Sequence, residues 1–411
     1  MDGHKDARAQ YQEGSDHCSV SCDPLTQTRP EAPDERSLFG MVPFNEKSLV
    51  SRGMSAKPAP HLRCLRLVNQ GRRTVVGTRL QALTQRLPSS RRARRGSVLV
   101  LAGMALAGAA TLVQRQSRKA ERAYPPRGQF VTAGGVRLHY VAKGSGRPVV
   151  FLHGNGAMVE DLLISGVFDQ SAHGYRAIAF DRPGFGHSER PRGRHWTASA
   201  QASILPAAFR FLGIERPIVV GHSWGTLVAL ALGLDYPQQV SGLVLISGYY
   251  YPTPRADVAL FSPPAIPVLG DLLNHTVTPF IGEAMAPRLI EKMFAPQGVS
   301  PRFSDRFPLA LTLRPSQIRA FAEDSAHMIT AARTLSERYR SLIPPTAILA
   351  GDADEIVSYR QAQRLHGDVA GSRLEILKGG SHMVHHIAPE RVVRAIDTVA
   401  LESTAWQRQA I

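Results

Sequence analysis

Ser223 lies in a turn that would make it a nucleophile. It is the central residue of Gly221–Gly225, which reads Gly-His-Ser-Trp-Gly. The apolar run Pro217–Val220 precedes this segment and the apolar run Leu227–Leu232 follows it, so the serine falls between a predicted strand and a predicted helix. Side-chain-free residues at both ends let two chain segments pass closely, and the positive end of the following helix lies beneath the hydroxyl. The pattern predicts a catalytic serine rather than an ordinary glycine-rich turn.

A serine hydroxyl is a poor nucleophile at neutral pH, so a base must take its proton and a carboxylate must orient that base. Asp354 follows the predicted buried strand Thr346–Ala350, and His382 follows the predicted strand Arg373–Leu377. Together with Ser223 they fall on three successive loops at one edge of a predicted parallel sheet, which is where such sheets bind ligands. The order Ser223, Asp354, His382 therefore predicts a catalytic triad.

Four further motifs carry a resemblance to a known family. They are the loop His153–Gly156 after the predicted strand Val149–Leu152, the D-x-x-G-x-G-x-S segment Asp181–Ser188, the G-x-x-D loop Gly351–Asp354 and the G-x-H loop Gly380–His382. From about Gly128 to its C-terminus, the chain resembles the α/β-hydrolase superfamily, close to its compact bacterial esterases and cofactor-free haloperoxidase-like members.

The resemblance implies an acyl-enzyme mechanism without a cofactor or a metal. His382 would take the proton of Ser223, and Asp354 would fix the tautomer of His382. The backbone N–H groups of Trp224 and Asn155 would stabilise the oxyanion. Since serine and not aspartate stands at the nucleophile position, the epoxide-hydrolase and haloalkane-dehalogenase branches, which need a carboxylate there, are disfavoured.

The acid has two competitors in the same loop. The family spacing favours Asp354, whereas Asp352 would cap the turn through its own side chain and Glu355 would lie in solvent.

The base also has competitors. His385 and His386 fall where the C-terminal helix should begin, with Pro389 in its first turn, so His382 is favoured. His153 is expected to hold the loop His153–Gly156, here named the oxyanion loop, by hydrogen bonds. A zinc site is disfavoured because these histidines lack close ligand spacing and no acidic cluster joins them.

These residues predict a serine hydrolase that acts on a small ester, thioester or related carbonyl compound. Two alternatives remain open. One is a binding or sensing protein of the same fold with little turnover, and the other is a carbon–carbon bond hydrolase or perhydrolase that uses the same triad. The sequence does not identify the physiological substrate.

The predicted fold is α/β: a doubly wound, mostly parallel eight-stranded sheet with a helical cap. We expect the core to occupy 125–248 and 343–411, and the cap to occupy 249–342, where Pro-rich turns and helical pieces interrupt the alternation. The aromatic residues Tyr249–Tyr251 and Phe261 would either line an acyl pocket or pack in the core. The expected strands are 129–132, 136–142, 148–152, 175–180, 217–222, 243–247, 345–350 and 373–377, and the expected helices are 157–170, 199–213, 224–236, 358–367 and 389–402.

Positive charge is concentrated in the first part of the 411-residue chain. Residues 1–124 hold 21 Lys and Arg against 10 Asp and Glu, which is +11 of the total +16. The polar, Gly- and Pro-rich composition predicts a disordered basic extension over 1–90. A start of translation at Met41 or Met54 is an alternative interpretation of this extension. The cysteines Cys18, Cys22 and Cys64 all precede the core, which therefore uses no disulfide.

An uncharged run, Val98–Val113, lies between two basic clusters. Extended by small flanking residues to 97–114, it predicts one transmembrane helix. A cleaved signal with processing near Ala107–Ala109 and a soluble helix are the alternatives. Basic residues on both sides would attract anionic lipid and leave the orientation undetermined. Nucleic-acid binding is not expected because the stretch lacks interleaved aromatic residues. The oligomeric state cannot be read from the sequence.

Overall fold

The computed structural model describes residues 91–409, so the extension predicted over 1–90 lies outside the described residues. The described chain forms one eight-stranded sheet in the order β1-β2-β4-β3-β5-β6-β7-β8. Pairs β1–β2 and β2–β4 are antiparallel, and the remaining pairs are parallel. The strands are β1 Gln129–Ala133, β2 Val136–Lys143, β3 Pro148–Leu152, β4 Arg176–Phe180, β5 Ile218–His222, β6 Gly242–Ile246, β7 Thr346–Gly351 and β8 Arg373–Leu377.

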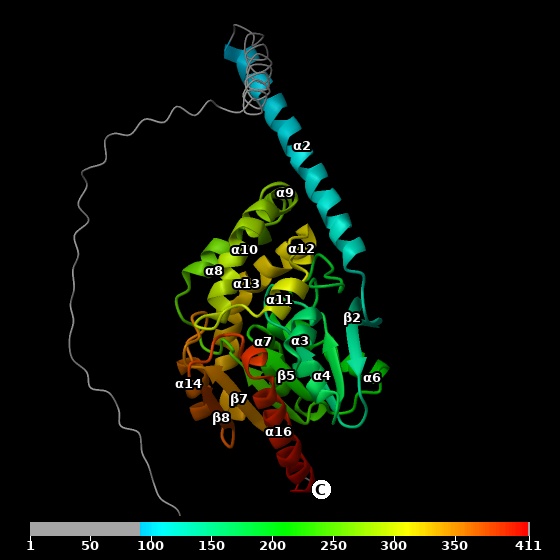
Figure 1. Ribbon diagram of the computed structural model, residues 1–411, viewed down its shortest axis with the longest axis vertical. Coiled ribbons are helices and arrows are strands. Elements are labelled where there is room, and N and C mark those ends of the chain that lie inside the picture. Colours follow the sequence, from blue (N-terminus) through cyan, green and yellow to red (C-terminus); the bar gives the residue numbers. More distant parts are fainter. Residues whose placement is uncertain (1–90, 410–411) are drawn as a thin grey trace, which may run out of the picture. The chain divides into compact units, whose positions relative to one another are not determined.

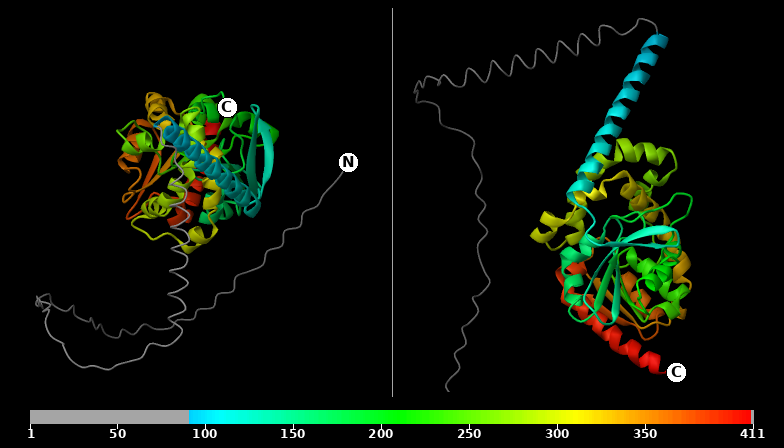
Figure 2. Two further views of the ribbon diagram at one scale, coloured as in Figure 1. Left: turned by 90° about the horizontal axis from the view of Figure 1, so that it is seen from above. Right: turned by 90° about the vertical axis from the view of Figure 1, so that its right-hand side faces the viewer.

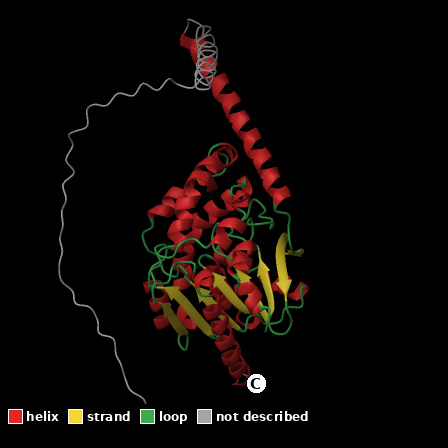
Figure 3. Ribbon diagram, in the orientation of Figure 1, coloured by secondary structure: helices red, strands yellow, loops and turns green. Residues whose placement is uncertain are grey.

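The central strands are buried on both faces, as parallel strands covered by helices must be (Figure 3). In β3, Val150 and Leu152 point into a core that also holds Leu227 and Leu230. Val149 and Phe151, which alternate with them, point into a second core that holds Ile396. Alternate side chains of one strand thus pack into two cores, one on each face of the sheet. The predicted mostly parallel α/β sheet is confirmed.

Helices cover both faces of the sheet (Figure 1). Two predicted helices are wrong in extent because each is broken. The predicted helix over 157–170 breaks at Gly166, whose φ of 88° is left-handed, and that over 199–213 breaks before Pro206, which lacks an N–H. The core helices are α3 Val159–Ser165, α4 Val167–Ser171, α5 Ala198–Ala202, α6 Leu205–Phe211, α7 Gly225–Asp235, α14 Arg360–Asp368, α15 Val384–Ile387 and α16 Pro389–Gln409.

A helical segment is inserted between β6 and β7, where the sequence predicts the cap. It lies at one side of the sheet, and the C-terminal end of α16 lies on the other side (Figures 1 and 2). Its long helix α13 returns the chain toward β7. The helices are α8 Ala256–Phe261, α9 Leu269–Thr276, α10 Thr278–Phe294, α11 Pro301–Arg306, α12 Leu309–Thr312 and α13 Pro315–Ser336.

The predicted transmembrane segment lies in α2, Arg91–Ala123, which extends beyond 97–114 at both ends. Within it, Arg95–Ala123 is long and apolar enough to cross a membrane. Its apolar 18-residue stretch has a mean hydropathy of 2.0, and 6% of that stretch is buried. A helix that is mostly exposed differs from the buried core helix of a soluble protein. The C-terminal part of α2 contacts the domain, since Ala120 clusters with Met158 and Leu311.

Substitution of Gly225 by alanine tests the closest packing of the sheet. A Cβ there would lie 2.3 Å from the carbonyl oxygen of Leu152, so β3 and α7 would have to separate. We expect Gly225→Ala to lower the free energy of unfolding by about 1–3 kcal/mol. Urea denaturation of the full chain in detergent measures it. Gly174→Ala is the matched control because a Cβ at Gly174 meets nothing within 4 Å. Equal midpoints for the two variants would contradict this packing.

Candidate active site

Ser223 lies at the end of β5 in the strained turn that its motif predicts. Its φ is 50°, in the left-handed region that a residue with a Cβ rarely adopts. Its N–H donates to the carbonyl oxygen of Ile246 at 2.8 Å, which ties the turn to the neighbouring strand. A Cβ on Gly154 would lie 3.2 Å from the Cβ of Ser223. The oxyanion loop and the serine turn are therefore adjacent.

The predicted acid and base form a buried pair. Nδ1 of His382 and Oδ2 of Asp354 are 2.8 Å apart, and the two side chains are 2% and 1% exposed. The other oxygen of Asp354 accepts the backbone N–H groups of Ile356 and Val357 at 2.7 and 2.8 Å. These bonds hold the Asp354 carboxylate against Nδ1 of His382, the ring nitrogen that the acid of a Ser-His-Asp triad contacts.

The two competitors of Asp354 have other roles. Asp352 accepts the N–H of Gly379 at 2.6 Å through its side chain and so caps the turn. Glu355 is exposed. Neither residue is paired with His382 among the described contacts.

His222 connects the serine turn to the histidine loop. Its Nε2 lies 3.2 Å from the carbonyl oxygen of His382, and the centroids of the two rings are 5.1 Å apart. Since His222 directly precedes Ser223, the histidine loop lies next to the serine turn. Within residues 91–409 the structure shows the contact between His382 and Asp354 but no hydrogen bond between Oγ of Ser223 and His382. Burial, together with the nearby His385 and His382, holds the pKa of His222 well below its usual range, so this imidazole is neutral.

Two backbone N–H groups flank Ser223 without an acceptor within residues 91–409: those of Asn155 and Trp224. The side chains of both residues are engaged elsewhere. Nδ2 of Asn155 donates to the carbonyl oxygen of Phe321 at 3.1 Å, and Nε1 of Trp224 donates to that of Asp324 at 3.0 Å. The residues predicted to stabilise an oxyanion therefore keep only their backbone donors available.

His153 holds the oxyanion loop, as the sequence predicts. Its Nδ1 is 2.8 Å from the carbonyl oxygen of Gly154, and its Nε2 accepts the N–H of Arg182 at 2.9 Å. Burial, with a contribution from the Arg182 charge, lowers the pKa of His153 to about 4. Both ring nitrogens are occupied, so this histidine does not shuttle protons.

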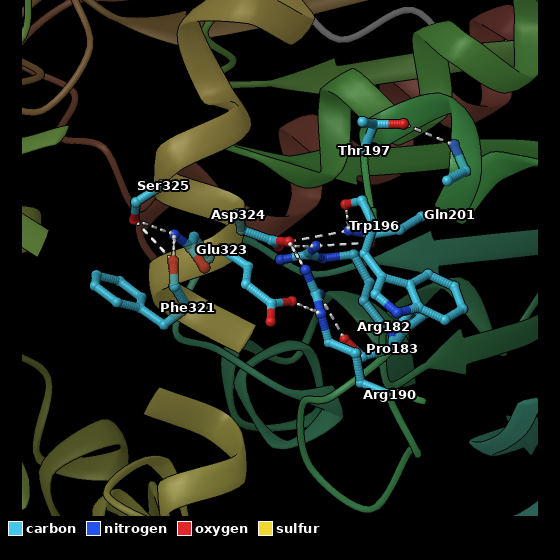
Figure 4. Close-up of polar contacts among 12 residues, drawn as sticks. Arg182, Pro183, Arg190, Trp196, Thr197, Gln201, Phe321, Glu323, Asp324 and Ser325 are labelled. Carbon is cyan, nitrogen blue, oxygen red and sulfur yellow. Dashed lines mark hydrogen bonds and ion pairs between the residues drawn. The ribbon is translucent and has the colours of Figure 1, made fainter. Parts of the chain in front are cut away.

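Reasoning from the sequence missed a buried ion cluster behind the oxyanion loop (Figure 4). Nη1 of Arg182 lies 2.6 Å from Oδ2 of Asp324, and both side chains are almost completely buried. Arg182 belongs to the motif Asp181–Ser188, but its partner lies 142 positions away on cap helix α13. The motif was therefore a signal for the arginine, whereas no local pattern marks Asp324.

A second missed group involves the two competitors of His382. Nε2 of His385 and Nε2 of His386 lie 2.9 and 2.8 Å from the two carboxylate oxygens of Asp161. Burial would raise the pKa of Asp161, but the two histidines hold it well below its usual range. His385 and His386 thus serve a carboxylate of their own rather than Ser223.

Asp161 and His385 also belong, with His222, to a group whose metal-ligand atoms lie within 4.8 Å of one another. Both oxygens of Asp161 already accept histidine N–H groups. These contacts describe a hydrogen-bonded core, and we propose no metal there.

The fold and this edge of the sheet define an α/β hydrolase. The family model described as alpha/beta hydrolase fold matches residues 147–389. That is more than half of the 411-residue chain, so the chain belongs to this family. Haloalkane dehalogenase 2 of Mycobacterium tuberculosis is 26% identical over 290 residues, which are 66% of this chain and 94% of that protein.

Solved structures show the same fold. An esterase from Thermogutta terrifontis is 23% identical with a TM-score of 0.56, and covers 67% of this chain and 99% of its own. A bacterial membrane phospholipase A is 22% identical with a TM-score of 0.53, and covers 77% of this chain and 99% of its own.

The shifted pKa of His153 predicts a pH dependence of stability. Because the unfolded imidazole binds a proton near pH 6.5 and the folded one only near pH 4, the unfolded state gains a proton over this interval. The free energy of unfolding should therefore fall as the pH falls from 6.5 to 4. His153→Gln should make this fall shallower in urea titrations at several pH values. His173→Gln, at an exposed position, is the control, and an unchanged slope in His153→Gln would contradict the assignment.

Proposed function

We propose that this protein is a serine hydrolase with the triad Ser223, Asp354 and His382. The observation that carries the proposal is the buried His382–Asp354 pair beside a serine held at a φ of 50°. A left-handed serine between a strand and a helix exposes its hydroxyl above the turn. The histidine loop reaches the same turn through His222.

The proposed chemistry is acyl transfer. Because Asp354 occupies Nδ1 of His382, the opposite nitrogen, Nε2, is left to accept the proton of Ser223. The serine oxygen attacks the carbonyl carbon, and the N–H groups of Asn155 and Trp224 stabilise the negative charge that develops on the carbonyl oxygen. His382 then returns the proton to the leaving group, and water hydrolyses the acyl-enzyme.

A carboxylate nucleophile, which a dehalogenase needs, is absent at position 223, where this chain has serine. We therefore propose an ester, thioester or related carbonyl substrate. Carbon–carbon bond hydrolysis and perhydrolysis use the same triad, and a substrate panel separates them. A phospholipid ester belongs in that panel because a membrane phospholipase A shares the fold.

We propose further that α2 anchors the enzyme in a membrane. Most of its apolar side chains face outward: Leu99 is 72% exposed and Met104 is 58% exposed, whereas Val113 at the end of the run is buried. Such a surface is costly in water and stable in lipid. Arg115, Arg118 and Lys119 follow the apolar stretch and would lie at the lipid headgroups.

The nucleophile is tested by Ser223→Ala. We expect turnover of p-nitrophenyl acetate and butyrate to fall by about 10³-fold or more, because the base then has no hydroxyl to activate. A fluorophosphonate should label the wild-type protein and not the variant. Ser241→Ala is the matched control. Ser241 is also buried, but it directly precedes β6 and so lies at the opposite edge of the sheet. Retained turnover in Ser223→Ala would rule out this triad.

The anchor is tested by placing charges in α2. Each arginine at the centre of a spanning helix costs about 2.5–3.5 kcal/mol, so the double variant Leu101→Arg, Leu106→Arg should move from the carbonate-washed membrane fraction to the soluble fraction. Leu401→Arg is the control, because Leu401 is a 75% exposed residue of α16. Wild-type protein in the soluble fraction after the carbonate wash would refute the anchor.

A further inference from the structure

A buried ion cluster joins the cap to the core (Figure 4). Asp324 of α13 is completely buried, and its two oxygens accept Arg182 Nη1 at 2.6 Å and Arg190 Nη2 at 3.0 Å. Nε2 of Gln201 donates to Oδ1 of Asp324 at 3.0 Å. Glu323 accepts Arg190 Nε at 2.6 Å, and its other oxygen lies 3.8 Å from Nη1 of Arg319, so three guanidinium groups face two carboxylates. The carboxylates of Asp324 and Glu323 thus offset most of the positive charge of the cluster.

Arg182 also binds the oxyanion loop directly. Its Nε donates to the carbonyl oxygen of His153 at 2.8 Å, and its Nη2 donates to that of Gly154 at 3.0 Å. In a planar trans peptide the N–H points away from the carbonyl of the same unit. The bond to Gly154 thus fixes the direction of the N–H of Asn155, one of the two oxyanion donors in the proposed mechanism.

Helix α13 reaches both donor residues by side-chain contacts as well. Nδ2 of Asn155 donates to the carbonyl oxygen of Phe321 and to Oγ of Ser325, at 3.1 and 3.0 Å. Nε1 of Trp224 donates to the carbonyl oxygen of Asp324 at 3.0 Å. These three acceptors lie within Phe321–Ser325, about one turn of the helix. One segment of the cap therefore holds both sides of the oxyanion hole.

We propose that Arg182 and Asp324 are positioning residues that make helix α13 a part of the oxyanion hole. The N–H groups of Asn155 and Trp224 are aligned for catalysis only when the cap is docked through this cluster. The proposal rests on the serine hydrolase function proposed above. Since a buried ion pair contributes little net stability, the geometry that it imposes is its main contribution.

The kinetic test is Asp324→Asn in the full chain. One oxyanion donor is worth about 10²–10³ in turnover. We expect misaligned donors to lower kcat by about 10–100-fold, while KM changes by less than about 3-fold. A trifluoromethyl ketone forms a tetrahedral oxyanion adduct with serine, so its affinity should fall by the same factor as kcat. A defect in substrate access would raise KM instead, and that result would overturn the proposal.

The matched control is the pair Arg192 and Asp271, which also joins a core loop to the cap. It is bidentate, at 2.7 Å for both bonds, but Arg192 is 65% exposed, and the described hydrogen bonds join neither side chain to His153–Gly156. Asp271→Asn should change kcat less than about 2-fold. If Asp324→Asn does not fold, Trp224→Phe decides the question, because it removes the indole bond to α13, keeps the backbone N–H and leaves an aromatic ring beside the Arg182 guanidinium. Unchanged kcat and inhibitor affinity in Trp224→Phe would then overturn the proposal.

A readout that needs no activity separates this proposal from the enzymatic one. Hydrogen–deuterium exchange of the full chain should become faster at His153–Gly156 in Asp324→Asn and stay unchanged there in Asp271→Asn. Unchanged exchange at this loop in both variants would overturn the coupling, whatever the turnover. A wild-type protein that shows this coupling but neither turnover nor fluorophosphonate labelling would refute the hydrolase function alone.

Discussion

The close passage of the turn Gly221–Gly225 beneath the end of β3 is the constraint on which the site depends. A Cβ at Gly225 would lie 2.3 Å from the carbonyl oxygen of Leu152 in β3, and a Cβ at Gly221 would lie 2.7 Å from the carbonyl oxygen of Gly225, so only glycine fits at both positions. The parallel register pairs Leu152 with Gly221, and both strands leave the sheet at the same edge. The loop after β3 and the serine after β5 are therefore neighbours because of the register. The proposed oxyanion donor, the N–H of Asn155, therefore owes its place beside the serine turn to strand pairing.

At this edge of the sheet, the carboxylate that pairs with each buried histidine determines what that histidine can do. His382 has Asp354, whereas His385 and His386 share Asp161. Burial lowers the pKa of His385, and the Asp161 charge offsets part of that effect. His382, His385 and His386 are of one residue type and lie within five positions of the chain. The pairing with a carboxylate, and not the residue type, therefore distinguishes the proposed base from the other two histidines.

Sequence patterns predicted the strands and the contact between Asp354 and His382 well because these depend on local periodicity and on motifs at strand ends. The strand expected over 148–152 is β3, and the loop residue Asp354 is paired with His382 as expected. Helix ends were less accurate, since the break at Gly166 depends on one left-handed residue. Asp324 was not predicted at all. Its importance comes from a contact with Arg182 across 142 positions, which no local pattern records.

The sequence also did not determine whether the aromatic run Tyr249–Tyr251 faces a pocket or the core. The structure buries all three rings in the larger core. The hydroxyl of Tyr251 donates to Asp368, and that of Tyr249 donates to the carbonyl oxygen of Thr253. An aromatic side chain at the start of a cap can face either way, because the direction depends on the partners that its hydroxyl finds.

The end of α2 bears on how an anchor would act on the enzyme. Ala120 packs with Leu311 of α12 and with Met158, which is completely buried and lies two positions after the oxyanion-loop residue Gly156. Glu121 lies 3.2 Å from Arg314, the residue before α13. The helix thus ends against residues that adjoin, in the chain, the loop and the cap helix that contact the proposed oxyanion donors. A flexible linker would leave these segments independent of a membrane, whereas a packed helix makes the proposed anchor part of the structure that supports them.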